Sequence, residues 1–540
     1  MFEFQKRKKA LIVIGLLFIF LVSTLPAIRS GVYLGHDLPF HFGRIQSISE
    51  ELANGQFPVR YESNAWYGHG YISSLMYGNI FLYIPAILVT IGLPVWRAYN
   101  IYVLLVNALT VLVSYFSFTK ILKSELSGLL STLIYCLAGY RLSNLYVRAA
   151  LGEYTAMIFI PVVVYGIHKI IAEEQEGEPL IKKILPLIIG ATGLIQNHIL
   201  STELVALFVL VYLLFNIKKT VLNIKELITS AILILLVNGF FLLPFVDSYS
   251  SMDLYVNSEM TAESIRGDGL YLSQLINPLT EGFGGSYVWS TVEEGYLQAG
   301  GLVIIAVLLT VITVIMTFKK LEVNKRKDIL VLSIFGIFAA WMSTVYFPWD
   351  LFAGNSGIAK LVSSVQYPWR YQLIAVVCFI LVGTYGFEIL CKDKSEKIKW
   401  ASLICIFVVA LGTSGYFYYT LSWKNPTVCN ERADENWADK LYLPAGTDRE
   451  LLLGTDIEFS GDNVVLPVLA YDNVHLTDSK GNEITWTKSH NNCVEISKAD
   501  YTSDINVQYK EPLMWRVAEV ISLVTIVGII IYYFRKLSRK

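Results

Sequence analysis

Long apolar runs separated by short polar stretches dominate the pattern of this chain. Twelve runs are long enough to cross a bilayer, whose hydrocarbon core needs about 20 helical residues. They lie near residues 10–28, 98–119, 126–143, 154–170, 184–198, 203–217, 227–246, 298–318, 329–347, 371–390, 400–422 and 514–534. The pattern predicts an all-α polytopic membrane protein with these twelve runs as its transmembrane helices.

A thirteenth apolar run, residues 77–93, decides the topology, and Pro85 and Gly92 interrupt it. If it spans, the later lysine clusters all fall outside the cell, against the positive-inside rule; if it lies in the interface, they all fall inside. We therefore expect a juxtamembrane or re-entrant helix here. The protein is then a multi-pass cell-membrane protein with both termini cytoplasmic.

This topology divides the chain into five parts. We expect a signal-anchor span (1–28), an outer loop with juxtamembrane helices (29–97), a multi-span domain (98–419), an outer β-rich domain (420–513), and a last span with a basic cytoplasmic tail (514–540). The multi-span domain carries two further outer loops, 247–297 and 346–370. A cleaved signal peptide in place of the first span would leave the remaining topology unchanged.

Residues 420–513 change to short runs with the two-residue period of strands. Asp478 to Asn482 separate two of these runs as a hairpin turn would. We expect a small extracellular antiparallel sheet or sandwich, with a binding or covering role. Cys429 and Cys493 fall in this part and are either a disulfide or two free thiols.

Composition agrees with lipid as the solvent of most of the chain. Hydrophobic residues make up 54% and charged residues 16%, with a mean hydropathy of +0.52. The net charge is −1 and basic residues cluster at helix ends, so we expect no nucleic-acid partner. The span interiors carry no row of charges, which argues against an ion-coupled transporter.

The first outer loop opens with a group of ionisable residues, Asp37, His41 and Arg44. Apolar residues at helical spacing predict an amphipathic surface helix over 38–53, with Gly55 ending it. On this helix the three side chains share one face, where they could hold a phosphate, bind a metal or remove a proton. Alternatively, Asp37 simply caps the helix.

Further ionisable residues stand at the outer ends of other spans. Arg148 and Glu153 flank a short outer turn, as functional groups or as a simple ion pair. Glu203 either lines an outward-facing cavity or is a buried carboxyl that stays neutral or pairs with His198 or with an arginine from another span. Arg370, behind a Pro-Trp corner, either binds a phosphate or snorkels.

Four short motifs resemble a known class. The pieces G-H-D-L-P-F-H (35–41), R-A-A-L-G-E-Y (148–154), N-H-I-L-S-T-E (197–203) and Y-P-W-R (367–370) resemble bacterial multi-pass proteins of the YfhO type, a group also labelled 6-pyruvoyl-tetrahydropterin-synthase-related membrane proteins. The order of span, acidic outer loop and helix pairs looks like the GT-C class of membrane glycosyltransferases.

The resemblance implies a GT-C-like fold and transfer of a sugar from a polyprenyl-phosphate donor to a glycan or glycolipid acceptor of the cell envelope. It places Asp37 where the class has its first-loop base or metal ligand, and Glu153 where the class often has a second acidic residue. Arg148 or Arg370 would take the phosphate role. From their own positions in the outer loop and at the outer ends of spans, we expect His41, Arg44, His198 and Glu203 to bind substrate as well. The chain lacks a clear D-x-D signature, which leaves a divalent metal open. The alternative function is a non-catalytic binder or flippase of a lipid-linked glycan.

Overall fold

A computed structural model describes residues 2–173, 177–259, 265–276, 308, 311, 323–352, 354, 357–424, 428–429 and 437–537. The chain forms two compact units, each assembled from separate segments. The first unit comprises Met1–Asp37, Asn100–Ala231 and Met260–Cys429. The second unit comprises Leu38–Tyr99, Ile232–Glu259 and Asn430–Lys540.

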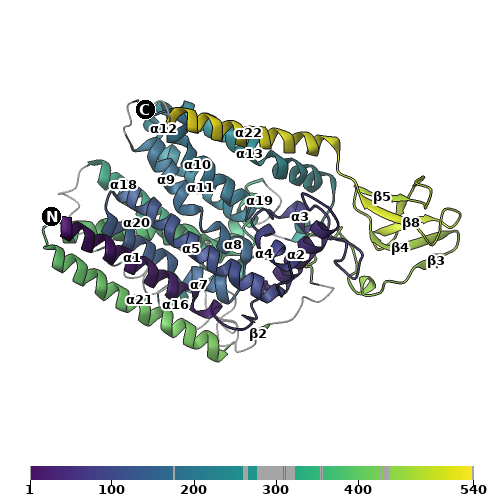
Figure 1. Ribbon diagram of the computed structural model, residues 1–540, viewed down its shortest axis with the longest axis horizontal. Helices are drawn as coiled ribbons and strands as arrows, with labels where there is room; N and C mark the ends of the chain where they lie inside the picture. The colour runs from purple at the N-terminus through teal and green to yellow at the C-terminus, as the bar shows by residue number, and fades with distance from the viewer. Residues whose placement is uncertain are drawn as a thin grey trace. The chain divides into compact units, whose positions relative to one another are not determined.

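Helices dominate the described residues (Figure 1). Their bounds are α1 Phe2–Thr24, α2 Leu38–Ala53, α3 Ser73–Met76, α4 Tyr83–Thr90, α5 Val95–Leu122, α6 Glu125–Cys136, α7 Gly139–Tyr146, α8 Leu151–Ala156, α9 Ile160–Ile171, α10 Leu180–Ile195, α11 Ile199–Phe215, α12 Ile217–Leu222, α13 Ile224–Ser251, α14 Val256–Glu259, α16 Leu272–Ile276, α18 Val323–Met342, α19 Gly357–Ser363, α20 Gln372–Cys391, α21 Glu396–Lys424 and α22 Leu513–Leu537.

Seven stretches among the described residues are long and apolar enough to cross a membrane: Lys6–Ala27, Val95–Leu122, Leu151–Ile171, Ile224–Ser251, Pro368–Cys391, Glu396–Ser422 and Leu513–Lys536. The protein is therefore membrane-embedded, as the apolar runs predicted. The total of twelve spans stays a prediction, and only residues 308 and 311 of the run 298–318 are described. The run 126–143 is two helices, α6 and α7, because the backbone leaves the helical path at Ala138.

The thirteenth apolar run contains only one short helix. Helix α4 has eight residues and is about 12 Å long, whereas the hydrocarbon core is about 30 Å thick. It packs on α2, and Ser49 and Thr90 share a hydrogen bond of 2.9 Å between their hydroxyls. This length agrees with the prediction that the run does not cross. Its interfacial position stays a prediction.

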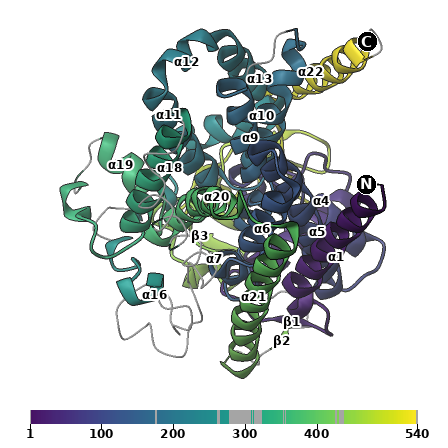
Figure 2. The ribbon, with the colours of Figure 1, turned by 90° about the vertical axis from the view of Figure 1, so that its left-hand side faces the viewer.

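Small residues set the closest helix packing in the first unit. Helices α9 and α10 lie side by side in both views (Figure 1, Figure 2). A Cβ at Gly166 would lie 2.6 Å from the backbone nitrogen of Leu187, and one at Gly190 would lie 2.7 Å from that of Val163. Glycine at both positions lets the backbones touch, as is common between membrane helices.

The strands form antiparallel sheets. In the second unit, one sheet has the order β3 (Glu458–Ser460), β4 (Asn463–Leu469), β8 (Cys493–Ser497), β7 (Thr487–Lys488), and another has β6 (Glu483–Ile484), β5 (Val474–Thr477), β9 (Asn506–Tyr509). Thr477 pairs with Glu483, and Asp478 Oδ1 accepts hydrogen bonds from the backbone of Lys480 and Asn482 at 2.8 Å each. The predicted hairpin and the small β-rich part near the C-terminus are confirmed. Its extracellular position stays a prediction.

In the first unit, β1 (Val32–Tyr33) pairs with β2 (Val428–Cys429). Cys429 and Cys493 are both free thiols. Burial raises the pKa of the Cys493 thiol to about 11, so this group is protonated near neutral pH.

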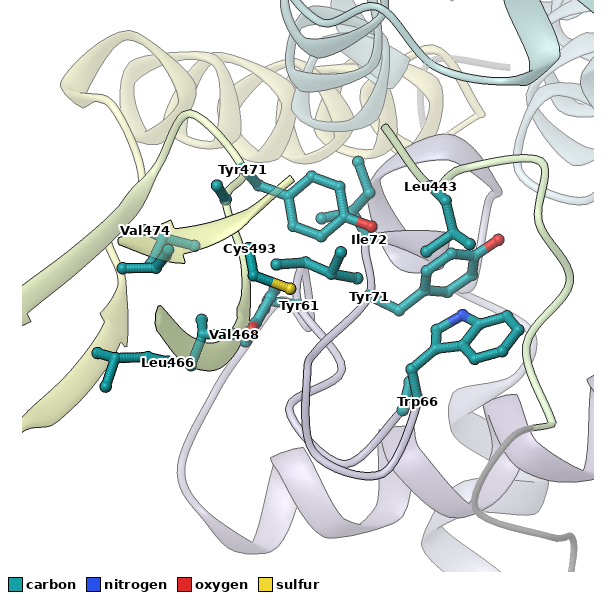
Figure 3. Close-up of a cluster of buried hydrophobic side chains, with 14 of the residues drawn as sticks. Tyr61, Trp66, Tyr71, Ile72, Leu443, Leu466, Val468, Tyr471, Val474 and Cys493 are labelled. Atoms are coloured by element: carbon teal, nitrogen blue, oxygen red, sulfur yellow. The ribbon is translucent and has the colours of Figure 1, made fainter. Parts of the chain in front are cut away.

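One hydrophobic cluster holds the second unit together. Side chains of the loop 61–76 pack against strands β4, β5 and β8 (Figure 3). Tyr71 is fully buried and donates a hydrogen bond of 2.6 Å to Asp439 Oδ1. Burial of such aromatic residues stabilises the fold by about 1.5–3 kcal/mol for each large side chain. The β-strands and this loop thus share one core.

A buried carboxyl in this core predicts a pH effect on stability. Glu62 is fully buried, and burial raises its pKa to about 7, although hydrogen bonds from Ser74 and Ser73 and the charge of Arg44 lower it. The unfolded chain loses this proton near pH 4.5, so between about pH 4.5 and 7 the folded state binds more protons. Stability should therefore fall as pH rises through this window.

We expect Glu62→Gln, which keeps the shape without the charge, to flatten this dependence. The measurement is the thermal unfolding midpoint of both proteins between pH 5 and 8. Parallel curves for the two proteins would contradict the assignment.

Candidate active site

A turn between α7 and α8 brings Arg148 and Glu153 together in the first unit. Helix α7 ends at Tyr146, and the Arg148 backbone nitrogen donates to Ser143 O at 2.9 Å. Ala149 has a φ of +55°, a left-handed conformation that costs a non-glycine residue on the order of 1 kcal/mol. Such strain is common where the surrounding structure fixes a functional group.

Glu153 is the centre of this cluster and is 1% exposed. Its Oε2 accepts from Arg148 Nη1 at 2.8 Å and from Arg370 Nε at 3.3 Å. Its Oε1 accepts from the Tyr140 hydroxyl and from Asn144 Nδ2, the latter at 3.1 Å. A buried carboxylate is tolerated only with this degree of pairing. Because both of its carboxylate oxygens accept hydrogen bonds, Glu153 holds Arg148 and Arg370 in place.

Arg148 connects Glu153 to Asp37. Its Nη1 also donates to Asn144 Oδ1 at 2.7 Å, and its Nη2 lies 3.6 Å from Asp37 Oδ2. Burial lowers the pKa of Arg148, but the carboxylates of Glu153 and Asp37 raise it more, and the net pKa lies above its ordinary value. The guanidinium therefore stays charged although it is buried.

Arg370 approaches the same carboxylate from a short 3-10 turn, Pro368–Tyr371. Its Nη1 donates to Val365 O at 2.7 Å and to Gln366 Oε1 at 2.8 Å. Tyr367 and Trp369 stack with ring centroids 4.4 Å apart, and the Arg370 guanidinium lies 5.1 Å from the Tyr367 centroid. The turn at Pro368 and Trp369 therefore holds Arg370 in place by ring packing as well as by hydrogen bonds.

Backbone hydrogen bonds hold Asp37 against the Arg148 turn. His36 N donates to Val147 O at 3.2 Å, and Asp37 N donates to Arg148 O at 2.7 Å. The Asp37 side chain is 40% exposed. Desolvation lowers the pKa of the neighbouring His36 imidazole, an effect that Asp37 opposes. Asp37 is thus the acidic group of the cluster that solvent or a substrate can reach.

This contact predicts a sharp effect of Gly35→Ala. A Cβ at Gly35 would lie 2.6 Å from the Ala149 Cβ. The backbone segments that contain Gly35 and Ala149 would therefore have to move apart. We expect an activity loss of about tenfold or more, because small displacements of positioned groups cost this much. The comparison is Gly412→Ala, where a Cβ would meet open space. Equal activity of both variants would show that the contact is irrelevant.

His198 and Glu203 begin the next helix. His198 is buried, and its Nδ1 accepts from the Ser201 backbone nitrogen at 3.2 Å, capping α11. It lies within electrostatic range of Arg370 and Glu153. Glu203 accepts a hydrogen bond of 2.7 Å from the Ser364 hydroxyl. Their substrate-binding roles stay predictions.

His41 and Arg44 lie on α2 in the second unit, and both are buried. Arg44 Nη2 donates to Tyr77 O at 3.3 Å, and the guanidinium lies 4.5 Å from the Tyr77 ring centroid. Helix α2 has the predicted bounds, but most of its side chains are buried instead of facing a membrane surface. The packing of α4 on α2 and of Trp437 on Gly43 accounts for this burial. Substrate binding by His41 and Arg44 stays a prediction.

Two residues of the cluster were missed from the sequence. Tyr140 and Asn144 lie four residues apart on α7 and both contact Glu153. Their spacing on one face of an otherwise apolar segment was the available signal.

No group of three or more His, Cys, Asp or Glu side chains that could hold a metal occurs among the described residues. The positive charge facing Asp37 is supplied by Arg148.

Comparisons with known proteins give the following relatives. No family model matches the sequence. An uncharacterized protein of Lactococcus lactis subsp. cremoris (strain MG1363) is 26% identical over 354 residues, covering 62% of this chain and 53% of that protein. The chain therefore spans about half the length of this relative.

Two solved structures are similar to this chain at 10% identity. The arabinofuranosyltransferase AftD from Mycobacteria matches with a TM-score of 0.43 over 76% of this chain and 27% of that chain. The Archaeoglobus fulgidus oligosaccharyltransferase in its apo form matches with a TM-score of 0.45 over 78% of this chain and 56% of that chain.

Proposed function

We propose that this protein is a membrane glycosyltransferase that transfers a sugar from a polyprenyl-phosphate-linked donor to a glycan or glycolipid acceptor of the cell envelope. The observation that carries the proposal is the cluster in which accessible Asp37 faces Arg148, while buried Glu153 fixes Arg148 and Arg370. The order of span, acidic outer loop and helix pairs, which resembles the GT-C class, supports the same reaction. In the proposed topology the cluster faces the outer leaflet and both termini are cytoplasmic.

The charges of the cluster suit an inverting transfer. Asp37 removes the proton of the acceptor hydroxyl, whose oxygen attacks the anomeric carbon from the face opposite the phosphate. The bond between that carbon and the phosphate oxygen breaks, and the phosphate leaves with the bonding electrons. The proton stays on Asp37 until water removes it.

The arginines stabilise the leaving group as its charge develops. Arg148 and Arg370 carry two positive charges against the single negative charge of Glu153. When Asp37 accepts the proton, it no longer balances Arg148, so one positive charge becomes available to the phosphate. Guanidinium forks bind phosphate oxygens strongly, and fixed charges of this kind lower barriers without reorganisation.

The test uses purified full-length protein in vesicles with a radiolabelled polyprenyl-phosphate sugar and extracted envelope glycans. The proposal expects label to move into the glycan fraction with release of polyprenyl phosphate. Movement of the intact labelled lipid between leaflets, without cleavage, would overturn it and favour the flippase alternative. Mass spectrometry of surface glycans with and without the gene identifies the acceptor.

A further inference from the structure

An apolar cavity lies in the first unit, between α9, α11, α18 and α20. Its volume is about 120 Å³, below the roughly 300–1,000 Å³ of sites for drug-sized ligands. Its wall is apolar over most of its length, with Ile160, Val164, Phe208, Leu332, Val377 and Leu381 among the lining side chains. The lining runs along α20 from Ile374 to Tyr385, which is about 16 Å of helix. This shape suits a hydrocarbon chain.

The polar groups of this cavity gather at one end. His168, Tyr212, Asp328 and Tyr385 line it, near the C-terminal ends of α9, α11 and α20 and the N-terminal end of α18. Tyr385 follows Arg370 by 15 residues, nearly all of them in α20, which is about 20 Å of helix. The polar end is thus remote from the Glu153 cluster, whose residues are not among those lining the cavity.

Both signs of charge occur at this polar end. Lys219 and Lys327 lie within electrostatic range of Asp328, and Lys123 and Lys219 lie within range of His168. Lys327 Nζ also donates to the Phe215 carbonyl at 2.9 Å, at the end of α11. The lysine ammonium groups attract a phosphate, and the Asp328 carboxylate attracts an ammonium. A lipid that carries both groups next to an apolar chain is therefore complementary to this cavity.

We propose that this cavity binds one acyl chain of a phospholipid whose headgroup carries a primary ammonium. The headgroup phosphate lies among the lysines, the ammonium faces Asp328, and the chain runs between α9 and α20 toward the Glu153 cluster. The site is separate from the one that holds the sugar donor, and binding here needs no transfer activity.

The experiment measures lipid retained by the full-length protein. Vesicles contain equal amounts of phosphatidylethanolamine, phosphatidylglycerol and phosphatidylcholine with identical chains, and native mass spectrometry follows gentle extraction. Wild type should retain one phosphatidylethanolamine about tenfold over the others, the size of one moderately strong charge pair. Val164→Trp, which fills the cavity, should lower retention about tenfold, whereas Val408→Trp at a 64% exposed position should not.

Asp328→Asn separates headgroup recognition from folding. This variant should still retain a phospholipid but lose the preference for phosphatidylethanolamine. Equal retention by Val164→Trp and Val408→Trp would overturn the proposal. Equal retention of the three headgroups by wild type, or selective retention of added polyprenyl phosphate, would overturn it as well.

Discussion

Replacing Asp37 by Asn should lower the rate of sugar transfer by about 10² to 10⁴-fold, the usual contribution of a general base. Asparagine keeps the size of the side chain, and its oxygen can still face Arg148, 3.6 Å away in the wild type. It cannot accept the proton of the acceptor hydroxyl near neutral pH. The loss should therefore appear in kcat more than in the KM for the lipid donor. Initial rates with purified protein and a labelled donor measure both quantities.

Asp350→Asn is the matched control for this prediction. Asp350 is also an exposed aspartate of the first unit, 64% exposed, and it pairs with Arg266 at 2.5 Å. Exposed pairs of this type contribute about 0–1 kcal/mol to stability, so the control should express and transfer like wild type. If Asp37→Asn transfers sugar as fast as Asp350→Asn, Asp37 is not the general base.

The local pattern predicted some elements of the fold but not the bonds that close the site. The bounds of α2 and the hairpin of β5 and β6 follow from periodicity and turn residues. The Arg370–Glu153 pair joins residues 217 positions apart, and no local pattern specifies such a contact. Because the sequence did not reveal the contact with Arg370, it did not decide whether Arg148 and Glu153 form a functional pair or a simple ion pair.

Burial was the other property that periodicity could not supply. Arg44 stands on the polar side of a helix with an apolar stripe, which predicted an exposed guanidinium. In the second unit Arg44 is completely buried. Its charge is accommodated by the Tyr77 carbonyl and ring, which lie 33 residues further along the chain. A helix pattern reports which face is apolar, not whether other segments also cover the polar face.

Removing the charge of Glu153 should damage both stability and activity. In Glu153→Gln, Arg148 and Arg370 would remain buried without their shared anion, and breaking a buried pair in this way costs about 3–5 kcal/mol. The thermal unfolding midpoint should fall well below that of wild type. Glu226→Gln, which breaks the partly exposed pair with Lys183 at 3.2 Å, should change stability by only about 0–1 kcal/mol.

The kinetics of the same variant distinguish positioning from catalysis. If Glu153 orients the arginines, the protein that remains folded should bind the lipid donor more weakly, so its KM should rise. Glu153→Asp restores the charge on a shorter side chain and should recover part of the donor affinity. Asp37→Asn, in contrast, should keep or strengthen donor binding, because the neutral amide no longer balances the charge of Arg148. A normal KM in folded Glu153→Gln would mean that the two arginines do not hold the phosphate, and the leaving-group role would have to pass to other cations.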